Sequence, residues 1–195
     1  MNCPLTKEVM VGATPEVEKL LKKGHSPNSR DSQGRTCLHW AAVGWSPKIL
    51  MLLLEAGAKV NAKDRFGHTP LILAVAKRID FVRILLEHGA DPNIKKNDGA
   101  TPLHQAVHQN RKDMIELLDE YGARLNCVLR EDAQIYAGAT PLHIAAECGH
   151  FGICEALLMR GCELNPRDAE GNTPLDLAAL TKRHPNICRL LKECG

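Results

Sequence analysis

Large aromatic side chains are scarce in this sequence, since Phe, Trp and Tyr make up 4% of its 195 residues. A core built on large rings is therefore excluded, and Ala, Leu, Ile and Val must form most of the buried surface. Long apolar runs are also missing. The longest, ILMLLL at residues 49–54, is far shorter than the ~18 residues of a membrane-spanning helix. The first residues, MNCPLTKEVMVG, lack the apolar stretch of a secretory signal. We therefore expect a protein that is not secreted and has no membrane partner.

Strong net charge and paired cysteines are missing as well. The formal charge of +2 gives no reason to expect nucleic acid as a partner, and basic residues are interspersed with acidic ones. Eight cysteines occur, at positions 3, 37, 127, 148, 154, 162, 188 and 194, without any C-x-x-C. This spacing predicts reduced thiols in the cytoplasm or nucleus rather than a disulfide framework.

What the sequence does contain is a repeat. Five blocks share Gly-x-Thr and an apolar pattern: GRTCLHWAAVG (34–44), GHTPLILAVAK (67–77), GATPLHQAVHQ (99–109), GATPLHIAAEC (138–148) and GNTPLDLAALT (171–181). An apolar segment that ends at Gly follows each of the first four blocks: MLLLEAGAKVN (51–61), RILLEHGADPN (83–93), ELLDEYGARLN (116–126) and EALLMRGCELN (155–165). A similar segment, VEKLLKKGHSPN (17–28), precedes the first block. Self-similarity at a spacing near 33 residues predicts a stacked array.

The residue types of one unit predict two helices and a turn. Thr is a good N-cap, and Pro at the first helical position loses no needed N–H. Leu and the paired Ala form a buried stripe, and the following Leu-rich segment forms a second amphipathic helix. Gly ends that helix, where a left-handed backbone is common. The polar stretch up to the next Gly-x-Thr forms a β-turn finger, and a single unit must stack to bury both of its faces.

With these motifs, the chain resembles the ankyrin-repeat proteins, whose repeats carry T-P-L-H-x-A over about 33 residues. The resemblance covers the whole chain in about six units. It implies an all-α solenoid of stacked helix–turn–helix units with β-hairpin fingers, in one domain over residues 1–195. The expected units are an N-terminal cap at 1–30, repeats at 31–63, 64–95, 96–134 and 135–167, and a C-terminal cap at 168–195. Polar residues on the terminal units (Glu8, Lys182, Arg183 and Lys192) are typical of caps, so we expect a complete array.

Some positions depart from the repeat. One residue is missing near AKRID (76–80), so the turn between the helices there should be distorted. The finger at 126–138 carries a six-residue insertion, which is either a tolerated surface insertion or a specificity element. Ile72 and Asp176 replace the motif His, so those units should lack one side-chain hydrogen-bond partner.

Two groups of residues could be mistaken for a metal or catalytic site. His104 and His108 have the spacing of two zinc ligands on one helix face, but Gln105 stands where a zinc protease needs Glu. His104 also shares its motif position with His39 and His143, and the family uses this His structurally.

The second group is Cys148, His150, Cys154 and Cys162, which are close in sequence but have no orienting base or oxyanion hole. No nucleotide-binding glycine motif occurs either. We therefore expect no catalytic residue, metal or cofactor. A metal- or Cys/His-dependent enzyme is the alternative, which bound metal or one hyper-reactive thiol would favour.

The resemblance implies that a partner protein contacts the finger tips and the groove side of the first helices. In this chain these positions are Gln33, Arg35, Val43, Trp45, Arg65, Phe66, His68, Lys77, Asp98, Ala100, His108, Gln109, Tyr136 and Glu147. Phe66 is an aromatic at a finger tip without a framework reason, and Trp45 is expected at the groove floor. Arg35, Arg65, Lys77 and His108 give this surface a mildly basic character, which favours a partner segment with acidic residues.

The resemblance also implies a modification. Finger Asn residues of ankyrin repeats are substrates of an asparaginyl hydroxylase that favours Leu eight residues upstream. Asn61, Asn93, Asn126 and Asn165 each have that Leu.

The function that we expect is a non-enzymatic interaction scaffold or adaptor, acting as a monomer. A regulatory inhibitor and a substrate adaptor of a ubiquitin ligase are alternatives that use the same surface. An assembly role through a homodimer is a further alternative.

Overall fold

The computed structural model describes residues 3–133, 136–180 and 184–195, which form 12 α-helices. The backbone divides into two compact units, Met1–Asn97 and Asp98–Gly195, called here the N-terminal unit and the C-terminal unit. Across these described residues, no helix is long and apolar enough to cross a membrane.

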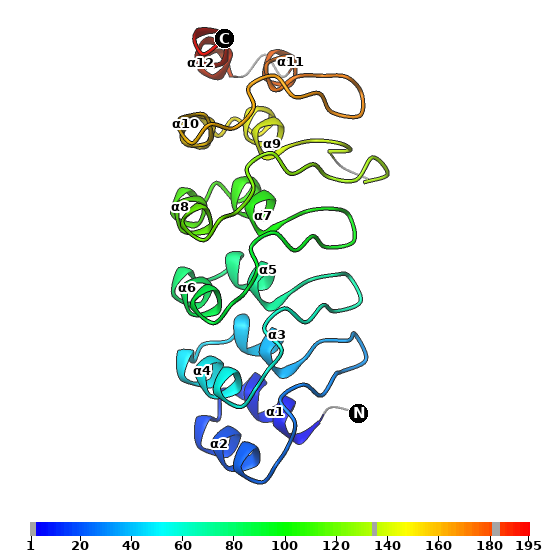
Figure 1. Ribbon diagram of the computed structural model, residues 1–195, viewed down its shortest axis with the longest axis vertical. Helices are drawn as coiled ribbons and strands as arrows, with labels where there is room; N and C mark the ends of the chain where they lie inside the picture. The colour runs from blue at the N-terminus through cyan, green and yellow to red at the C-terminus, as the bar shows by residue number, and fades with distance from the viewer. Residues whose placement is uncertain (1–2, 134–135, 181–183) are drawn as a thin grey trace. The chain divides into compact units, whose positions relative to one another are not determined.

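The N-terminal unit contains three helix pairs. Its helices are α1 (Pro4–Val11), α2 (Thr14–Lys22), α3 (Cys37–Ala42), α4 (Pro47–Glu55), α5 (Pro70–Val75) and α6 (Ile79–Glu87). The first helices α1, α3 and α5 contact one another in order, and so do the second helices α2, α4 and α6. Figure 1 shows these two rows, with the fingers extending from the side of the first helices. The buried stripe of the first row includes Leu5, Leu38 and Leu71, as the apolar pattern predicts.

The C-terminal unit repeats this arrangement. Its helices are α7 (Pro102–His108), α8 (Lys112–Glu120), α9 (Pro141–Glu147), α10 (Phe151–Met159), α11 (Pro174–Leu180) and α12 (Pro185–Glu193). Within this unit, α7, α9 and α11 contact one another in order, and α10 contacts both α8 and α12 (Figure 1). The all-α fold of stacked helix–turn–helix pairs that the sequence predicts is therefore confirmed within each unit.

Thr and His start the first helices as a capping box. In α3, the backbone N–H of Thr36 donates to His39 Nδ1 at 3.0 Å, and the Thr36 hydroxyl lies 2.9 Å from the same nitrogen. Nδ1 is thus an acceptor, so the proton is on Nε2, which donates to the carbonyl of His68 in the next repeat at 3.0 Å. His143 makes the same bonds with Thr140 and with the Asn172 carbonyl. The motif His is therefore structural, and it ties neighbouring repeats together.

The fingers differ from the expected β-hairpins, because the described residues contain no β-strand. In four fingers an aspartate side chain accepts backbone N–H groups of the turn, namely Asp31, Asp64, Asp98 and Asp168. Asp64 Oδ1 accepts the backbone N–H groups of Phe66 and His68 at 2.9 and 2.8 Å, and the Asp64 N–H donates to the His68 carbonyl at 2.9 Å. Side-chain acceptors replace strand pairing here, since a short turn offers too few backbone pairs for a ladder.

The expected distortion of the turn after α5 is confirmed. Helix α5 ends at Val75, one residue earlier than the pattern of α7 and α9, and its turn into α6 has no left-handed residue. Asn110 and Gly149 supply that residue, at φ 55° and 78°, in the turns after α7 and α9. Residues 134 and 135 of the inserted finger lie outside the described residues, and in its described part the Leu129 N–H donates to the Ala139 carbonyl at 3.0 Å.

The expectation for Asp176 was wrong. Its carboxylate accepts both the N–H and the hydroxyl of Thr173, at 2.9 and 2.7 Å, so this unit keeps its cap. Ile72 does leave Thr69 with one capping bond, from the Ile72 N–H. Of the polar cap residues, Lys182 and Arg183 lie outside the described residues, while Lys192 is exposed on α12.

Candidate functional site

Backbone hydrogen bonds join successive finger tips within each unit. In the N-terminal unit the Arg65 N–H donates to the Gln33 carbonyl at 3.0 Å, and the Asn97 N–H donates to the Phe66 carbonyl at 3.1 Å. In the C-terminal unit the equivalent bonds run from Arg130 to Asp98 and from Ala169 to Ala137. Because their backbones are tied together, the finger tips of one unit present a preformed surface.

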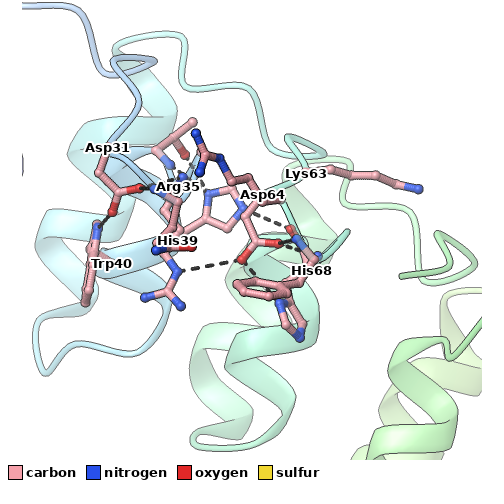
Figure 2. Close-up of polar contacts among 12 residues, drawn as sticks. Asp31, Arg35, His39, Trp40, Lys63, Asp64 and His68 are labelled. Atoms are coloured by element: carbon pink, nitrogen blue, oxygen red, sulfur yellow. Dashed lines mark hydrogen bonds and ion pairs between the residues drawn. The ribbon is translucent and has the colours of Figure 1, made fainter. Parts of the chain in front are cut away.

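A cluster of charged and aromatic side chains lies at the base of two fingers in the N-terminal unit. Figure 2 shows Arg35 between Trp40 and Asp64. The guanidinium carbon lies 5.1 Å from the Trp40 ring centroid, and Nε lies 3.6 Å from Asp64 Oδ2. Trp40 is itself held by a bond of 3.1 Å from Nε1 to Asp31 Oδ2. Arg35 is therefore oriented by stacking on one side and an ion pair on the other.

The two aspartates of this cluster are held in their charged form. Burial of the Asp64 carboxylate opposes ionisation, but the backbone N–H groups of His68 and Phe66 outweigh it, so the pKa of Asp64 is lowered. Burial also opposes ionisation of Asp31, and the N–H groups of Arg35 and Gln33 outweigh it, so the pKa of Asp31 is lowered too. His68 Nδ1 lies 3.2 Å from Asp64 Oδ2. Asp64 therefore organises the predicted residues Arg35, Phe66 and His68 around one buried carboxylate.

Most of the other predicted residues of the N-terminal unit are accessible. Phe66 is 51% exposed at its finger tip, with its ring 5.9 Å from that of His68, and Gln33, Arg65 and Lys77 are exposed. Trp45 lies in the turn between α3 and α4 and is 86% exposed. Its indole is thus open to solvent, and its expected place at the groove floor stays a prediction.

Two of the predicted residues of the C-terminal unit, His108 and Glu147, lie near Tyr136. Its ring lies 6.5 Å from the ring of His108, edge to face, and its hydroxyl lies 3.5 Å from Cys148 Sγ. Tyr136 has φ 61°, an uncommon backbone conformation for a large residue. The insertion thus positions this tyrosine against the end of α7 and the end of α9. Gln109 is exposed beside His108, whereas Asp98 accepts the Ala100 N–H in its finger turn.

Beside Tyr136 lies a cavity of about 230 Å³ that is acidic on one side. Its lining residues are Tyr136, Ala137, Ala139, Glu147, Asp168, Glu170 and Leu177. Burial, and then the nearby carboxylates of Asp168 and Glu170, raise the pKa of Glu147. Glu147 was a predicted contact residue, but Asp168 and Glu170 were missed. Their positions in the last finger could have identified them, because they are equivalent to Asp64 and Phe66.

The histidines and cysteines that resemble a metal or catalytic site in the sequence lie in different surroundings in the fold. His104 Nδ1 accepts the Thr101 N–H at 3.2 Å in a capping box, whereas His108 is exposed at the end of α7. Burial raises the pKa of Cys154 to about 12 and that of Cys162 to about 11. These two thiols are protonated at neutral pH and are poor nucleophiles.

The finger asparagines link repeats. Asn61 Nδ2 donates to the Gly89 carbonyl at 3.1 Å, and its Oδ1 accepts the Asp91 N–H at 3.0 Å. Asn126 Oδ1 accepts the Glu163 N–H in the same way. Hydroxylation of Asn61, Asn93, Asn126 and Asn165 stays a prediction, which peptide mass spectrometry would confirm by one added oxygen.

The two units carry opposite charge, a feature that the near-neutral total hides. Residues 1–97 contain 15 Lys and Arg against 9 Asp and Glu, whereas residues 98–195 contain 10 against 14. The formal charges are therefore +6 and −4, which together give the +2 of the chain. The sequence interpretation missed this asymmetry because it compared charges locally and not between the two halves.

Comparison with known proteins agrees with the repeat geometry. The family model for ankyrin repeats (three copies) matches this chain over residues 5–96, 66–128 and 126–195. The chain belongs to the ankyrin-repeat family. Members of this family are generally interaction modules without enzymatic activity, so a protein-binding domain is the expected class.

Similar proteins include several long chains. The chain is 32% identical over 186 residues to the human transient receptor potential cation channel subfamily A member 1, which covers 90% of this chain and 16% of the channel. It is 31% identical over 193 residues to the mouse B-cell lymphoma 3 protein homolog, covering 95% of this chain and 41% of that protein. It is 30% identical over 173 residues to the chicken nuclear factor NF-kappa-B p105 subunit, and the match covers 86% of this chain and 17% of that protein. The chain thus spans less than half the length of each of these ankyrin-repeat relatives.

Proposed function

We propose that this chain is a scaffold or adaptor that holds a partner protein on its finger tips and first helices. The observation that carries the proposal is the exposure of large side chains on a backbone that is already fixed. Phe66 is exposed on a finger that Asp64 closes and that the Asn97 N–H ties to its neighbour. A surface that is ordered before binding loses little conformational entropy when the partner docks.

The contact residues of the proposal are those predicted from the sequence, taken unit by unit. In the N-terminal unit they are Gln33, Arg35, Val43, Trp45, Arg65, Phe66, His68 and Lys77. In the C-terminal unit they are Asp98, Ala100, His108, Gln109, Tyr136 and Glu147. No residue of either set is given a catalytic, metal-binding or cofactor-binding role. The chain acts as a monomer in the cytoplasm or nucleus, where its eight free cysteines remain reduced.

A partner segment with acidic residues fits the N-terminal unit only. Arg35, Arg65 and Lys77 lie in a unit with a formal charge of +6, which attracts carboxylates. In the C-terminal unit, the charge of −4 and the carboxylates around Glu147 oppose such a segment.

Two specific roles use this surface. As a regulatory inhibitor the chain would hold its partner inactive, and as a substrate adaptor of a ubiquitin ligase it would deliver the partner for modification. Depleting the protein from cells distinguishes them, because only loss of an adaptor raises the partner's abundance.

Quantitative affinity capture from cell lysate tests the proposal. We expect the wild-type chain to enrich a defined partner and the double variant Arg65→Ala, Phe66→Ala to lose about 10-fold or more of it, because hot-spot truncations cost about 2 kcal/mol. The control is Met159→Ala, which removes an apolar side chain from α10 that is even more exposed, at 82% against 51% for Phe66. Equal enrichment by the wild type, the double variant and the control would show that the finger surface is not the interface.

A further inference from the structure

The first helices of the N-terminal unit carry exposed apolar side chains at equivalent positions. The position in question is the seventh residue after the N-cap. It is Met10 in α1, counted from the N-cap Cys3, and Val43 directly after α3, counted from the N-cap Thr36. Met10 is 48% exposed, its neighbour Val11 is 67% exposed and Val43 is half-buried. In the C-terminal unit the same position is occupied by His108, Glu147 and Leu180. Leu180 is apolar too and is 70% exposed, but the polar His108 and Glu147 precede it in the C-terminal unit, so Met10 and Val43 are the two large apolar residues that occupy this position in successive first helices.

Trp45 extends this row at the turn between α3 and α4. The hydroxyls of Thr14 and Ser46 lie 3.4 Å apart, so the α1–α2 turn lies against the α3–α4 turn. Val11 is the last residue of α1, directly before the first of these turns, and Trp45 lies in the second. Trp40 and Leu73 occupy equivalent half-buried positions in α3 and α5. We call this set the first-helix surface: Met10, Val11, Trp40, Val43, Trp45 and Leu73. Several exposed apolar side chains on neighbouring elements mark an interaction site, whereas a single one, such as Met159 on α10, does not.

The rim of the first-helix surface is basic. Arg35 is stacked over Trp40 and its Nε lies 3.6 Å from Asp64 Oδ2, while its side chain remains 31% exposed. Lys77 is exposed at the end of α5, and Lys7 is exposed on α1. The nearby carboxylates of Asp31 and Asp64 already accept backbone N–H groups in their finger turns. The rim therefore offers the exposed ammonium groups of Lys7 and Lys77, together with the exposed part of an Arg35 that Asp64 already orients, to an external carboxylate.

We propose that the first-helix surface binds an amphipathic segment of a partner protein whose apolar side chains cover Trp45 and whose flanking acidic residues pair with Arg35 and Lys77. This inference rests on the proposed function and identifies the chemistry of its partner. Charge complementarity determines the choice of occupant, because a unit with a formal charge of +6 repels a basic amphipathic segment. Trp45 is the anchor, since a tryptophan that is 86% exposed has the most surface to bury.

Binding of defined peptides, measured by fluorescence anisotropy, tests the inference. One labelled peptide of about 18 residues places Leu on one helical face and Glu beside it, and a matched peptide has Lys in place of Glu. We expect the Glu peptide to bind the wild-type chain at least about 10-fold more tightly than the Lys peptide. Trp45→Ala and Arg35→Gln should each weaken the Glu peptide about 10-fold, whereas Met159→Ala should leave it unchanged.

Several results would overturn the inference. They are equal binding of the two peptides, an equal effect of Trp45→Ala and Met159→Ala, no binding of the Glu peptide, or tighter binding of a DNA oligonucleotide than of the Glu peptide. Affinity capture with Trp45→Ala separates this failure from that of the proposed function. If the Trp45→Ala variant still captures the cellular partner and the double variant Arg65→Ala, Phe66→Ala does not, the proposed function holds but the first-helix surface is not part of the interface.

Discussion

Replacing Gly67 with alanine is expected to lower the free energy of unfolding by about 3–4 kcal/mol, because the change combines backbone strain with a steric clash. Gly67 has φ 79°, a left-handed conformation that alanine adopts at a cost. An added Cβ would also lie 2.7 Å from the Asn97 backbone nitrogen and 2.9 Å from Lys96 Cα. These are backbone atoms of the neighbouring finger, so no side-chain rotation can relieve the contact.

Gly57→Ala is the matched control for this experiment. Gly57 has φ 80°, but nothing lies within 4 Å of the position that its Cβ would take. Alanine there should cost only the strain, about 1 kcal/mol. Urea unfolding followed by circular dichroism gives both values, and their difference measures how tightly the two fingers approach. Equal costs for the two variants would show that the fingers separate easily and are not a preformed surface.

The helical part of this fold could be predicted in detail from the sequence. Thr36 and His39 form the cap that the motif requires, and Gly57 is left-handed as its place after a helix predicts. Each of these features depends on residues that are close in sequence and recur in every unit. Local capping rules therefore suffice for them.

The candidate site could be predicted only in part, because its geometry depends on contacts between repeats. Phe66 was correctly expected at an exposed tip, whereas Trp45 is exposed in a turn and its expected place at a groove floor stays a prediction. The arrangement of Arg35 between Trp40 and Asp64 joins residues of two repeats, so no single repeat motif contains it. The opposite charges of the units likewise become visible only when the boundary at Asn97 is known.

His39→Ala is the second substitution with a large expected effect, a loss of about 2–4 kcal/mol in the free energy of unfolding. His39 is fully buried and bonds the Thr36 N–H, the Thr36 hydroxyl and the His68 carbonyl, at 3.0, 2.9 and 3.0 Å (Figure 2). Removing the ring leaves these groups buried without partners, which costs about 1–3 kcal/mol each before relaxation. His108→Ala, an exposed histidine at the end of α7, should change stability by less than about 0.5 kcal/mol.

The same histidine makes stability depend on pH in a predictable direction. Burial lowers the pKa of His39 below its ordinary value of 6.5, and burial lowers the pKa of His143 as well. The folded state therefore favours the neutral rings, since Nδ1 must accept a hydrogen bond from Thr. Their contribution is complete above pH 6.5 and is lost as the pH falls through the lowered pKa of the folded state.

Acid loss of stability as the pH falls below about 6.5 should therefore shrink in His39→Ala and shrink further in His39→Ala with His143→Ala. Asp31 and Asp64 contribute separately, because their pKa values are lowered from 3.8 and they lose their effect only at lower pH. Chemical unfolding at a series of pH values, compared with His108→Ala, separates the two ranges. If the histidine variants kept the full pH dependence of the wild type, the neutral capping histidines would not be its source.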